Sequence, residues 1–256
     1  MKAYAIFLGC SIPARVNHYE ASSRMVLKEF GVDLLDIELF SCCGPVPLRS
    51  ISFEMFLTVG ARSLALAEAE GLDIMCLCSG CFSTLSDVNH QLRENSELRK
   101  DINKKLEPAG MAYGGKIAVK HFLNVLHQDV GIDKIKKQIV RPYKNLRIAT
   151  HYGCHTVRPS KIVQSGSIPT VFFDELVEAT GANSVEWNAD FLCTSCPFCQ
   201  VQFDSIQAKI ASDRGNAYDL PSILYPQLLG LAMDMDTDLL GIDNNRISLD
   251  SIDTFF

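Results

Sequence analysis

Two segments of this chain repeat one pattern, and the duplication constrains the fold more than any other feature of the sequence. Residues 3–10 form an apolar run that ends in Gly-Cys, and residues 146–154 form a similar run whose Gly-Cys comes 144 positions later. A helix-like stretch follows each run and is closed by Gly31 in the first half and by Gly181 in the second. Both glycines suit the left-handed position just after a helix. The sequence therefore predicts two similar halves.

Strand-like runs alternate with helix-like stretches through both halves. The first half has a helix candidate at 51–70, followed by an apolar strand at 72–77. Such alternation is typical of α/β architectures, which place their binding sites just beyond strand ends. We predict an α/β fold with parallel strands flanked by helices. Its halves are 1–145, which includes linking helices, and 146–256, which ends in a packing helix at 223–233.

Composition excludes several classes of protein. Hydrophobic residues make up 47% of the 256 positions, which is enough for a sizeable core, and the net charge of −6 disfavours nucleic-acid binding. There is no apolar run of about 18 residues, so no membrane span is expected. The apolar N-terminal run is too short for a signal peptide. Ten cysteines in a chain of this length indicate metal or redox chemistry in a reducing, cytoplasmic compartment rather than disulfide stapling.

Nine of the ten cysteines fall into two sets. The first set is Cys10, Cys42, Cys43, Cys78 and Cys81, and the second set is Cys154, Cys193, Cys196 and Cys199. A structural zinc ion and a cubane [4Fe–4S] cluster each take four cysteines, so five thiols with an adjacent pair indicate a cluster of another shape. The tenth, Cys76, lies within an apolar strand and is expected to be a small buried hydrophobe.

The first set resembles a known family. Cys-Cys-Gly at 42–44 with Cys-x-x-Cys at 78–81 is similar to the cysteine-rich CCG domain, and its duplication resembles the B subunit of heterodisulfide reductase from methanogenic archaea. The runs at 151–155, 174–182 and 196–204 support the resemblance. It implies two Rossmann-like CCG halves and two noncubane [4Fe–4S] clusters, with the nine cysteines as iron ligands. The implied substrate is the mixed disulfide of coenzyme M and coenzyme B, reduced in methanogenesis.

The same resemblance implies partner proteins. Electrons would arrive through the iron–sulfur C subunit and the flavin-containing A subunit, and a larger assembly with a hydrogenase or formate dehydrogenase is a further implied partner. The chain has no Gly-x-Gly-x-x-Gly motif and no P-loop. We therefore expect any flavin to bind a partner and not this chain.

The second motif is shorter than the first. Cys193 is followed by Thr194 instead of Cys-Gly, and it lies 3 residues before Cys196, whereas 36 residues separate Cys42 from Cys78. If Cys193 is the counterpart of Cys42, the second half lacks 33 residues after Cys193 by comparison with the first half. Either the sequence omits a segment, or a real deletion has removed the second cluster site. We favour the first interpretation, because a deletion would remove a helix and a strand yet leave the Cys-x-x-Cys intact.

Several basic residues are candidates for catalysis and substrate binding. His151 and His155 flank the first cysteine of the second set and could donate protons to leaving thiolates, or could be structural. Arg158 and Lys161 could bind the anionic groups of the coenzymes, with Lys120 as an alternative. Lys120 is more often a solvated surface residue.

The sequence leaves three functions open. The first is the catalytic subunit of heterodisulfide reductase. The second is an electron-transfer CCG subunit of a sulfur-oxidising, thiol:fumarate or glycolate oxidoreductase, although the chain lacks the ferredoxin-type cysteine run of fused versions. The third is a zinc-stabilised interaction module without catalysis.

Overall fold

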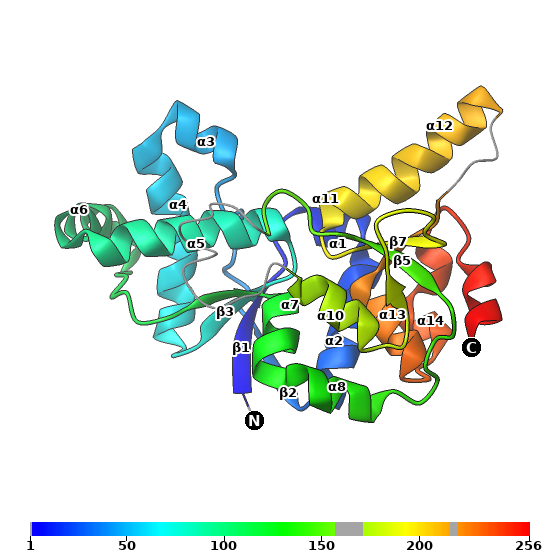
Figure 1. Cartoon of the computed structure of the whole chain (residues 1–256). Coiled ribbons are helices and arrows are strands. Elements are labelled where there is room, and N and C mark those ends of the chain that lie inside the picture. Colours follow the sequence, from blue (N-terminus) through cyan, green and yellow to red (C-terminus); the bar gives the residue numbers. More distant parts are fainter. Residues whose placement is uncertain (1, 157–170, 216–219) are drawn as a thin grey trace. The chain divides into compact units, whose positions relative to one another are not determined.

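The computed structural model describes residues 2–156, 171–215 and 220–256, which build two four-stranded parallel sheets (Figure 1). The first sheet, in spatial order, is β2 (Val32–Asp36), β1 (Lys2–Phe7), β3 (Asp73–Cys76) and β4 (Val119–His121). The second is β6 (Asn183–Ser184), β5 (Arg147–His151), β7 (Phe191–Thr194) and β8 (Ser222–Leu224). The two orders are the same, so the predicted duplicated α/β fold is confirmed.

Each sheet belongs to its own compact unit, and each unit contains segments from both parts of the chain. Unit 1 holds the first sheet together with residues 154–156, which follow β5 in the sequence. Unit 2 holds the second sheet together with residues 11–31, which follow β1, and residues 123–153. The boundary at residue 145 stays a prediction.

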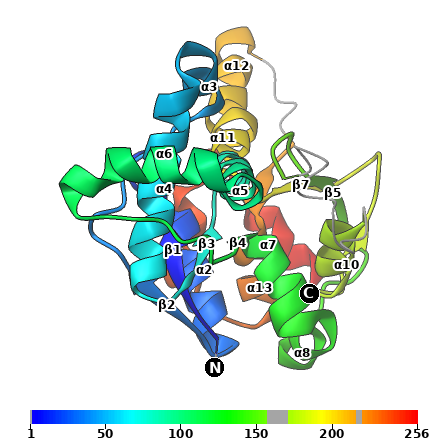
Figure 2. The ribbon, with the colours of Figure 1, turned by 90° about the vertical axis from the view of Figure 1, so that its left-hand side faces the viewer.

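The helices of unit 1 pack on its sheet or on one another. They are α3 (Val46–Ile51), α4 (Phe53–Ala69), α5 (Ser79–Glu94) and α6 (Ser96–Leu106), with a 3₁₀ turn at Glu107–Ala109. The Ser52 hydroxyl accepts a hydrogen bond from the Met55 amide at 3.2 Å, which caps the start of α4. Both α4 and α5 contact β3 and each other (Figure 2). The predicted helix at 51–70 and strand at 72–77 are therefore confirmed as α4 and β3.

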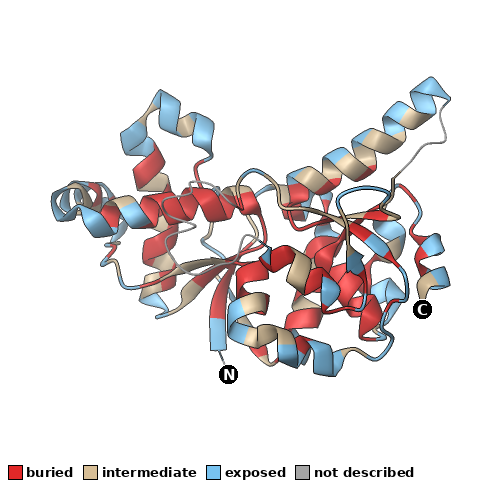
Figure 3. Cartoon of the chain, in the orientation of Figure 1, coloured by how far each residue is buried: buried red, intermediate tan, exposed pale blue. Residues whose placement is uncertain are grey.

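The helices of unit 2 surround the second sheet. The helices before the second sheet are α1 (Ser11–Arg15), α2 (Asn17–Glu29), α7 (Phe122–Asn124), a π-helical segment Val125–Gly131 and α8 (Ile132–Gln138). Later come α10 (Phe172–Glu178), α11 (Pro197–Gln200), a π-helical segment Val201–Ile206, α12 (Gln207–Arg214), α13 (Tyr225–Ala232), α14 (Thr237–Leu240), Ile242–Asn244 and Asp250–Phe255. Helix α13 is buried along its whole length and packs on α2 (Figure 3).

Two short strands differ from the sequence-based expectation. The predicted packing helix at 223–233 begins later, because Ile223 and Leu224 belong to β8, which pairs with β7. The linking region contains β4 as well as helices, since residues 119–121 pair with β3. Three residues are too few to show a strand period, so only the pairing reveals them.

The described residues contain no helix that is both long enough and apolar enough to span a membrane.

One buried group in unit 2 makes stability depend on pH. His18 of α2 is 6% exposed, and its Nε2 has no hydrogen-bond partner among the described residues. Burial lowers the pKa of His18 from 6.5 to about 4. The unfolded chain therefore binds a proton between these pH values that the folded chain does not bind, and stability falls as the pH falls from 6.5 towards 4.

We predict that His18→Leu flattens this pH dependence. Between pH 7.5 and 5.5 the wild-type unfolding free energy should fall by on the order of 1 kcal/mol through His18 alone. Urea unfolding at both pH values measures the difference. His90→Gln supplies the matched control, because it removes an imidazole that lies at the surface. An equal pH slope in wild type and His18→Leu would contradict this account.

Candidate metal centre

Successive strands of the first sheet deliver the first set of cysteines. Cys10 follows β1, and Cys42 and Cys43 follow β2. Cys78 follows β3 and is the N-terminal cap of α5, whose first turn carries Cys81. The carboxyl ends of parallel strands meet at one edge of a sheet, where α/β folds form their sites. All five cysteines belong to unit 1.

Four of the five sulfurs form one hydrogen-bonded network. Hydrogen bonds join Cys43 to Cys42 and to Cys81, and another joins Cys81 to Cys78. Burial, and then the charges of Cys43 and Cys10, raise the pKa of Cys42, so Cys10 lies within electrostatic reach of this network. The bond from Cys81 lowers the pKa of Cys43, while the same bond raises that of Cys81 well above its usual value.

Two residues that the sequence analysis did not single out support this network. The Thr84 side chain hydrogen-bonds Cys43 and lowers its pKa further. Gly9 has a φ of 65°, and a Cβ built on it would lie 2.7 Å from the Sγ of Cys81. No side chain fits there, so Gly9 lets the backbone approach the Cys81 sulfur closely. The Gly-Cys pattern was the available signal, but it does not show which sulfur packs on the glycine.

An ion pair connects the helices on either side of the network. Arg49 of α3 pairs with Asp87 of α5, and Asp87 is 5% exposed. The Gln91 amide also donates to Asp87 at 3.3 Å. Helix α3 directly follows the Cys-Cys-Gly turn, and α5 carries Cys81. The pair therefore ties the two cysteine-bearing segments together.

Two further cysteines are core residues. Cys76 in β3 and Cys193 in β7 are both 0% exposed, and burial raises the pKa of each thiol well above its usual value. The expectation that Cys76 is a buried hydrophobe is confirmed.

The sequence analysis placed the missing residues of the second half after Cys193, and the structure corrects this position. Cys193 lies inside a strand, not in a connection between strands as Cys42 and Cys43 do. All four strands of the second sheet are present, and only residues 185–190 connect β6 to β7. The shortening therefore precedes β7 and removes no strand. The argument against a real deletion, that it would remove a strand, was wrong.

The other members of the second set lie beyond strand ends. Cys154 is exposed in the turn after β5, Cys196 is the buried N-terminal cap of α11, and Cys199 is half-buried in that helix. Just after Cys154, the Thr156 hydroxyl donates to Ser79 Oγ at 2.7 Å within unit 1.

The structure places three of the five basic candidates. His151 ends β5 with its ring 4.8 Å from that of Phe203, and burial lowers its pKa. His155 is half-buried in the following turn, and Lys120 is half-buried in β4 opposite Met75. The two remaining candidates lie outside the described residues and are Arg158 and Lys161.

The donor set suits a multi-iron group better than a single ion. Within residues 2–156, 171–215 and 220–256, no three His, Cys, Asp or Glu side chains are arranged to hold one metal ion. The first set nevertheless offers four hydrogen-bonded sulfurs with Cys10 within their electrostatic reach, and the glycine at position 9 leaves room beside one of them. Soft thiolate ligands in this number fit an iron–sulfur cluster.

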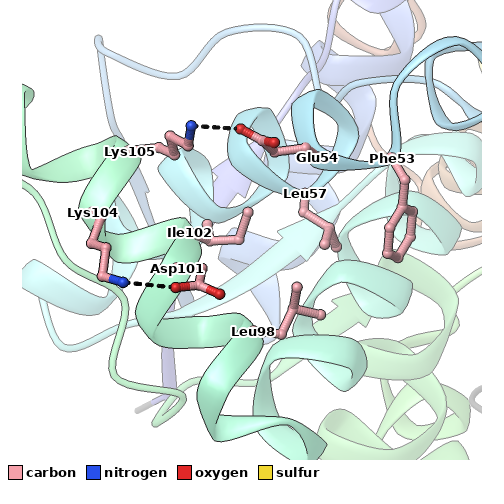
Figure 4. A pocket seen from close by; sticks show the side chains of 8 residues that line it. All are labelled: Phe53, Glu54, Leu57, Leu98, Asp101, Ile102, Lys104 and Lys105. Carbon is pink, nitrogen blue, oxygen red and sulfur yellow. Dashed lines mark hydrogen bonds and ion pairs between the residues drawn. The ribbon is translucent and has the colours of Figure 1, made fainter.

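A separate cavity of about 580 Å³ lies between α4 and α6 (Figure 4). Its lining is apolar at Phe53 and Leu57, and it is bordered by two exposed ion pairs, one of which joins Lys104 to Asp101 at 2.8 Å. No cysteine lines this cavity, so it is distinct from the candidate metal centre.

Comparison with known proteins places the chain in a family. The cysteine-rich domain family CCG matches residues 4–86. The chain is 34% identical to the B subunit of the Ferredoxin/F(420)H(2)-dependent CoB-CoM heterodisulfide reductase of Methanosarcina acetivorans, over 96% of this chain and 94% of that protein. The chain therefore belongs to the family of heterodisulfide reductase B subunits. The family context is that of iron–sulfur redox proteins.

The chain is also similar to a fumarate reductase subunit and to one solved structure. The chain is 28% identical to the 8-methylmenaquinol:fumarate reductase membrane anchor subunit of Wolinella succinogenes, over 96% of this chain and 97% of that protein. The crystal structure of a hypothetical protein from Helicobacter pylori matches with a TM-score of 0.69 and 18% identity, over 97% of this chain and 52% of the other. The latter supports the fold alone.

We predict that Arg49→Met destabilises unit 1 by about 2 kcal/mol, because it leaves the buried Asp87 carboxylate without its cation. Urea unfolding measures the loss. The matched control is Lys104→Met, which removes an exposed ion pair and should change stability little. Equal effects of the two substitutions would show that the Arg49–Asp87 pair does not stabilise the fold.

Proposed function

We propose that this chain is the disulfide-reducing B subunit of a heterodisulfide reductase complex. In this proposal a noncubane [4Fe–4S] cluster binds to the first set of cysteines, and the substrate is the heterodisulfide of coenzyme M and coenzyme B, in methanogenesis. The observation that carries the proposal is the network of four hydrogen-bonded thiols at one edge of the first sheet, with Cys10 within its electrostatic reach. The relative from Methanosarcina acetivorans, aligned over nearly the whole chain, supports the choice of substrate.

The residues of the chain would prepare the site for the cluster. When bound, the cluster supplies a one-electron redox centre. Cys43, Cys78 and Cys81 are all buried, so they would shield it from water. Thr84 would hold Cys43 as a thiolate ready to ligate iron. Shielding by protein and hydrogen bonds to sulfur tune the potential of such centres.

Proton supply is proposed for the two histidines. Disulfide reduction consumes protons as well as electrons, because the products are two thiols. Burial lowers the pKa of His151, and an imidazole is the side chain that most often carries protons in catalysis. His155 is the second candidate donor.

Partners and compartment follow from the same proposal. An iron–sulfur C subunit would deliver electrons from a flavin-containing A subunit. The Methanosarcina relative is itself one subunit of a larger reductase, which supports such partners. All ten cysteines are thiols in the structure, which suits a reducing cytoplasm.

A second candidate function is electron transfer within a fumarate reductase complex. The observation that favours it is the similarity to the Wolinella protein, which extends over 96% of this chain. This role uses the same cluster site but requires no disulfide substrate.

We predict that Cys81→Ala abolishes iron binding whereas Cys76→Ala retains it. Both cysteines lie near the start of α5, but only Cys81 belongs to the thiol network. Iron and acid-labile sulfide, measured per chain after purification without oxygen, report the difference. An unchanged iron content in Cys81→Ala would show that Cys81 is not a ligand of the cluster.

We also predict that Gly9→Ala lowers the iron content by more than half, whereas Gly71→Ala leaves it unchanged. The two glycines have φ values of 65° and 68°, so each alanine costs about 1 kcal/mol of backbone energy. Only at Gly9 does the new methyl collide with the Cys81 sulfur, since nothing lies within 4 Å of the Gly71 position. Equal iron loss in both variants would attribute the effect to backbone strain.

The activity test separates the two candidate functions. The iron-loaded chain, assembled with its partner subunits and supplied with a reduced one-electron dye, should reduce the coenzyme M–coenzyme B heterodisulfide and not fumarate. Heterodisulfide left intact while fumarate is consumed would favour the second candidate.

A further inference from the structure

Strand pairing allows each residue of the second sheet to be matched with its counterpart in the first sheet. In the first sheet Phe7 of β1 pairs with Cys76 of β3, and in the second His151 of β5 pairs with Thr194 of β7. Phe7 and His151 each lie three residues before the first cysteine of their own set. Thr194 is therefore the counterpart of Cys76.

The same alignment matches the two Cys-x-x-Cys motifs. Cys78 and Cys81 lie two and five residues after Cys76 of β3. Cys196 and Cys199 lie at the same distances after Thr194 of β7. Cys78 and Cys196 are also both N-terminal caps with extended backbones. The second half therefore keeps its Cys-x-x-Cys in the original structural position.

The turn after the first strand is kept as well. Gly9 and Gly153 have φ values of 65° and 69°. A Cβ built on Gly153 would lie 3.5 Å from the Sγ of Cys199, just as Gly9 faces Cys81. Three of the five thiol positions thus have counterparts in the second half.

The other two positions have none. In the first half the connection from β2 to β3 carries the Cys-Cys-Gly turn at 42–44 and helices α3 and α4. In the second half the connection from β6 to β7 is residues 185–190, which include no cysteine. Cys193 does not replace the pair, because it is the counterpart of Met75 and is fully buried in the strand between β5 and β8.

We infer that this chain holds one iron–sulfur cluster, on the first set of cysteines, and that the second half carries none. The inference rests on the proposed function, since it concerns how many clusters the same chain binds. A [4Fe–4S] cluster takes four cysteine ligands, and the second half retains only Cys154, Cys196 and Cys199 in matching positions. The second sheet has kept its topology and lost the connection that completes the site.

The first test counts iron in the full chain purified without oxygen. We expect about four irons and four sulfides per chain, unchanged in the double variant Cys196→Ala/Cys199→Ala and lost in the matched double variant Cys78→Ala/Cys81→Ala. About eight irons in the wild type, falling to about four in Cys196→Ala/Cys199→Ala, would overturn the inference.

The second test needs no substitution. Cys10 and Cys154 are both exposed thiols in corresponding turns, so each should react with iodoacetamide unless a cluster holds it. In the iron-loaded wild type we expect modification of Cys154 and protection of Cys10, mapped by mass spectrometry. After iron is removed with a chelator, both should react. Equal protection of the two cysteines in the loaded protein would contradict a single cluster.

The two failures are distinguishable. A wild-type chain that binds no iron and reacts at both cysteines would overturn the proposed function, and the inference with it. Eight irons with both cysteines protected would overturn the inference alone and leave the proposed function intact.

Discussion

The parallel pairing of β1 with β3 is the interaction on which the candidate centre depends. In this register the last residue of β1, Phe7, pairs with the last residue of β3, Cys76. The turn at Gly9 therefore lies beside the start of α5, because hydrogen bonds between the two strands fix where each one ends. A shift of one residue would reverse every side chain on a strand and separate the sulfurs. The close approach of Gly9 to the Cys81 sulfur follows from this alignment.

The second half has the same sheet topology as the first half but lacks a Cys-Cys-Gly turn. Its sheet keeps the strand order and parallel pairing of the first, because these depend on buried strand residues such as Phe191 and Ile223. The connection between β6 and β7 contributes nothing to that pairing, so a short one suffices. A sheet can therefore persist without the connection that carries the Cys-Cys-Gly turn in the first half.

Residues of one type have different roles here because burial and neighbours differ. Cys76 and Cys193 are fully enclosed within strands, where burial disfavours the thiolate and leaves a small apolar side chain. Cys43 is also buried, but hydrogen bonds from Cys81 and Thr84 outweigh that burial and favour the charged form. The availability of a thiolate for metal binding is thus decided by hydrogen-bond donors and not by exposure alone.

The sequence by itself determined the duplicated α/β fold, the grouping of the first five cysteines and the buried nature of Cys76, because apolar runs and cysteine spacing are local signals. Only the tertiary structure decided the position of the shortening, since Cys193 follows the second half's helix at nearly the spacing of Cys42 and only strand register assigns it to β7. The roles of Thr84 and of the Arg49–Asp87 pair also depend on folding, which brings together side chains that carry no signal as separate letters. Register and packing are long-range properties, and spacing along the chain does not encode them directly.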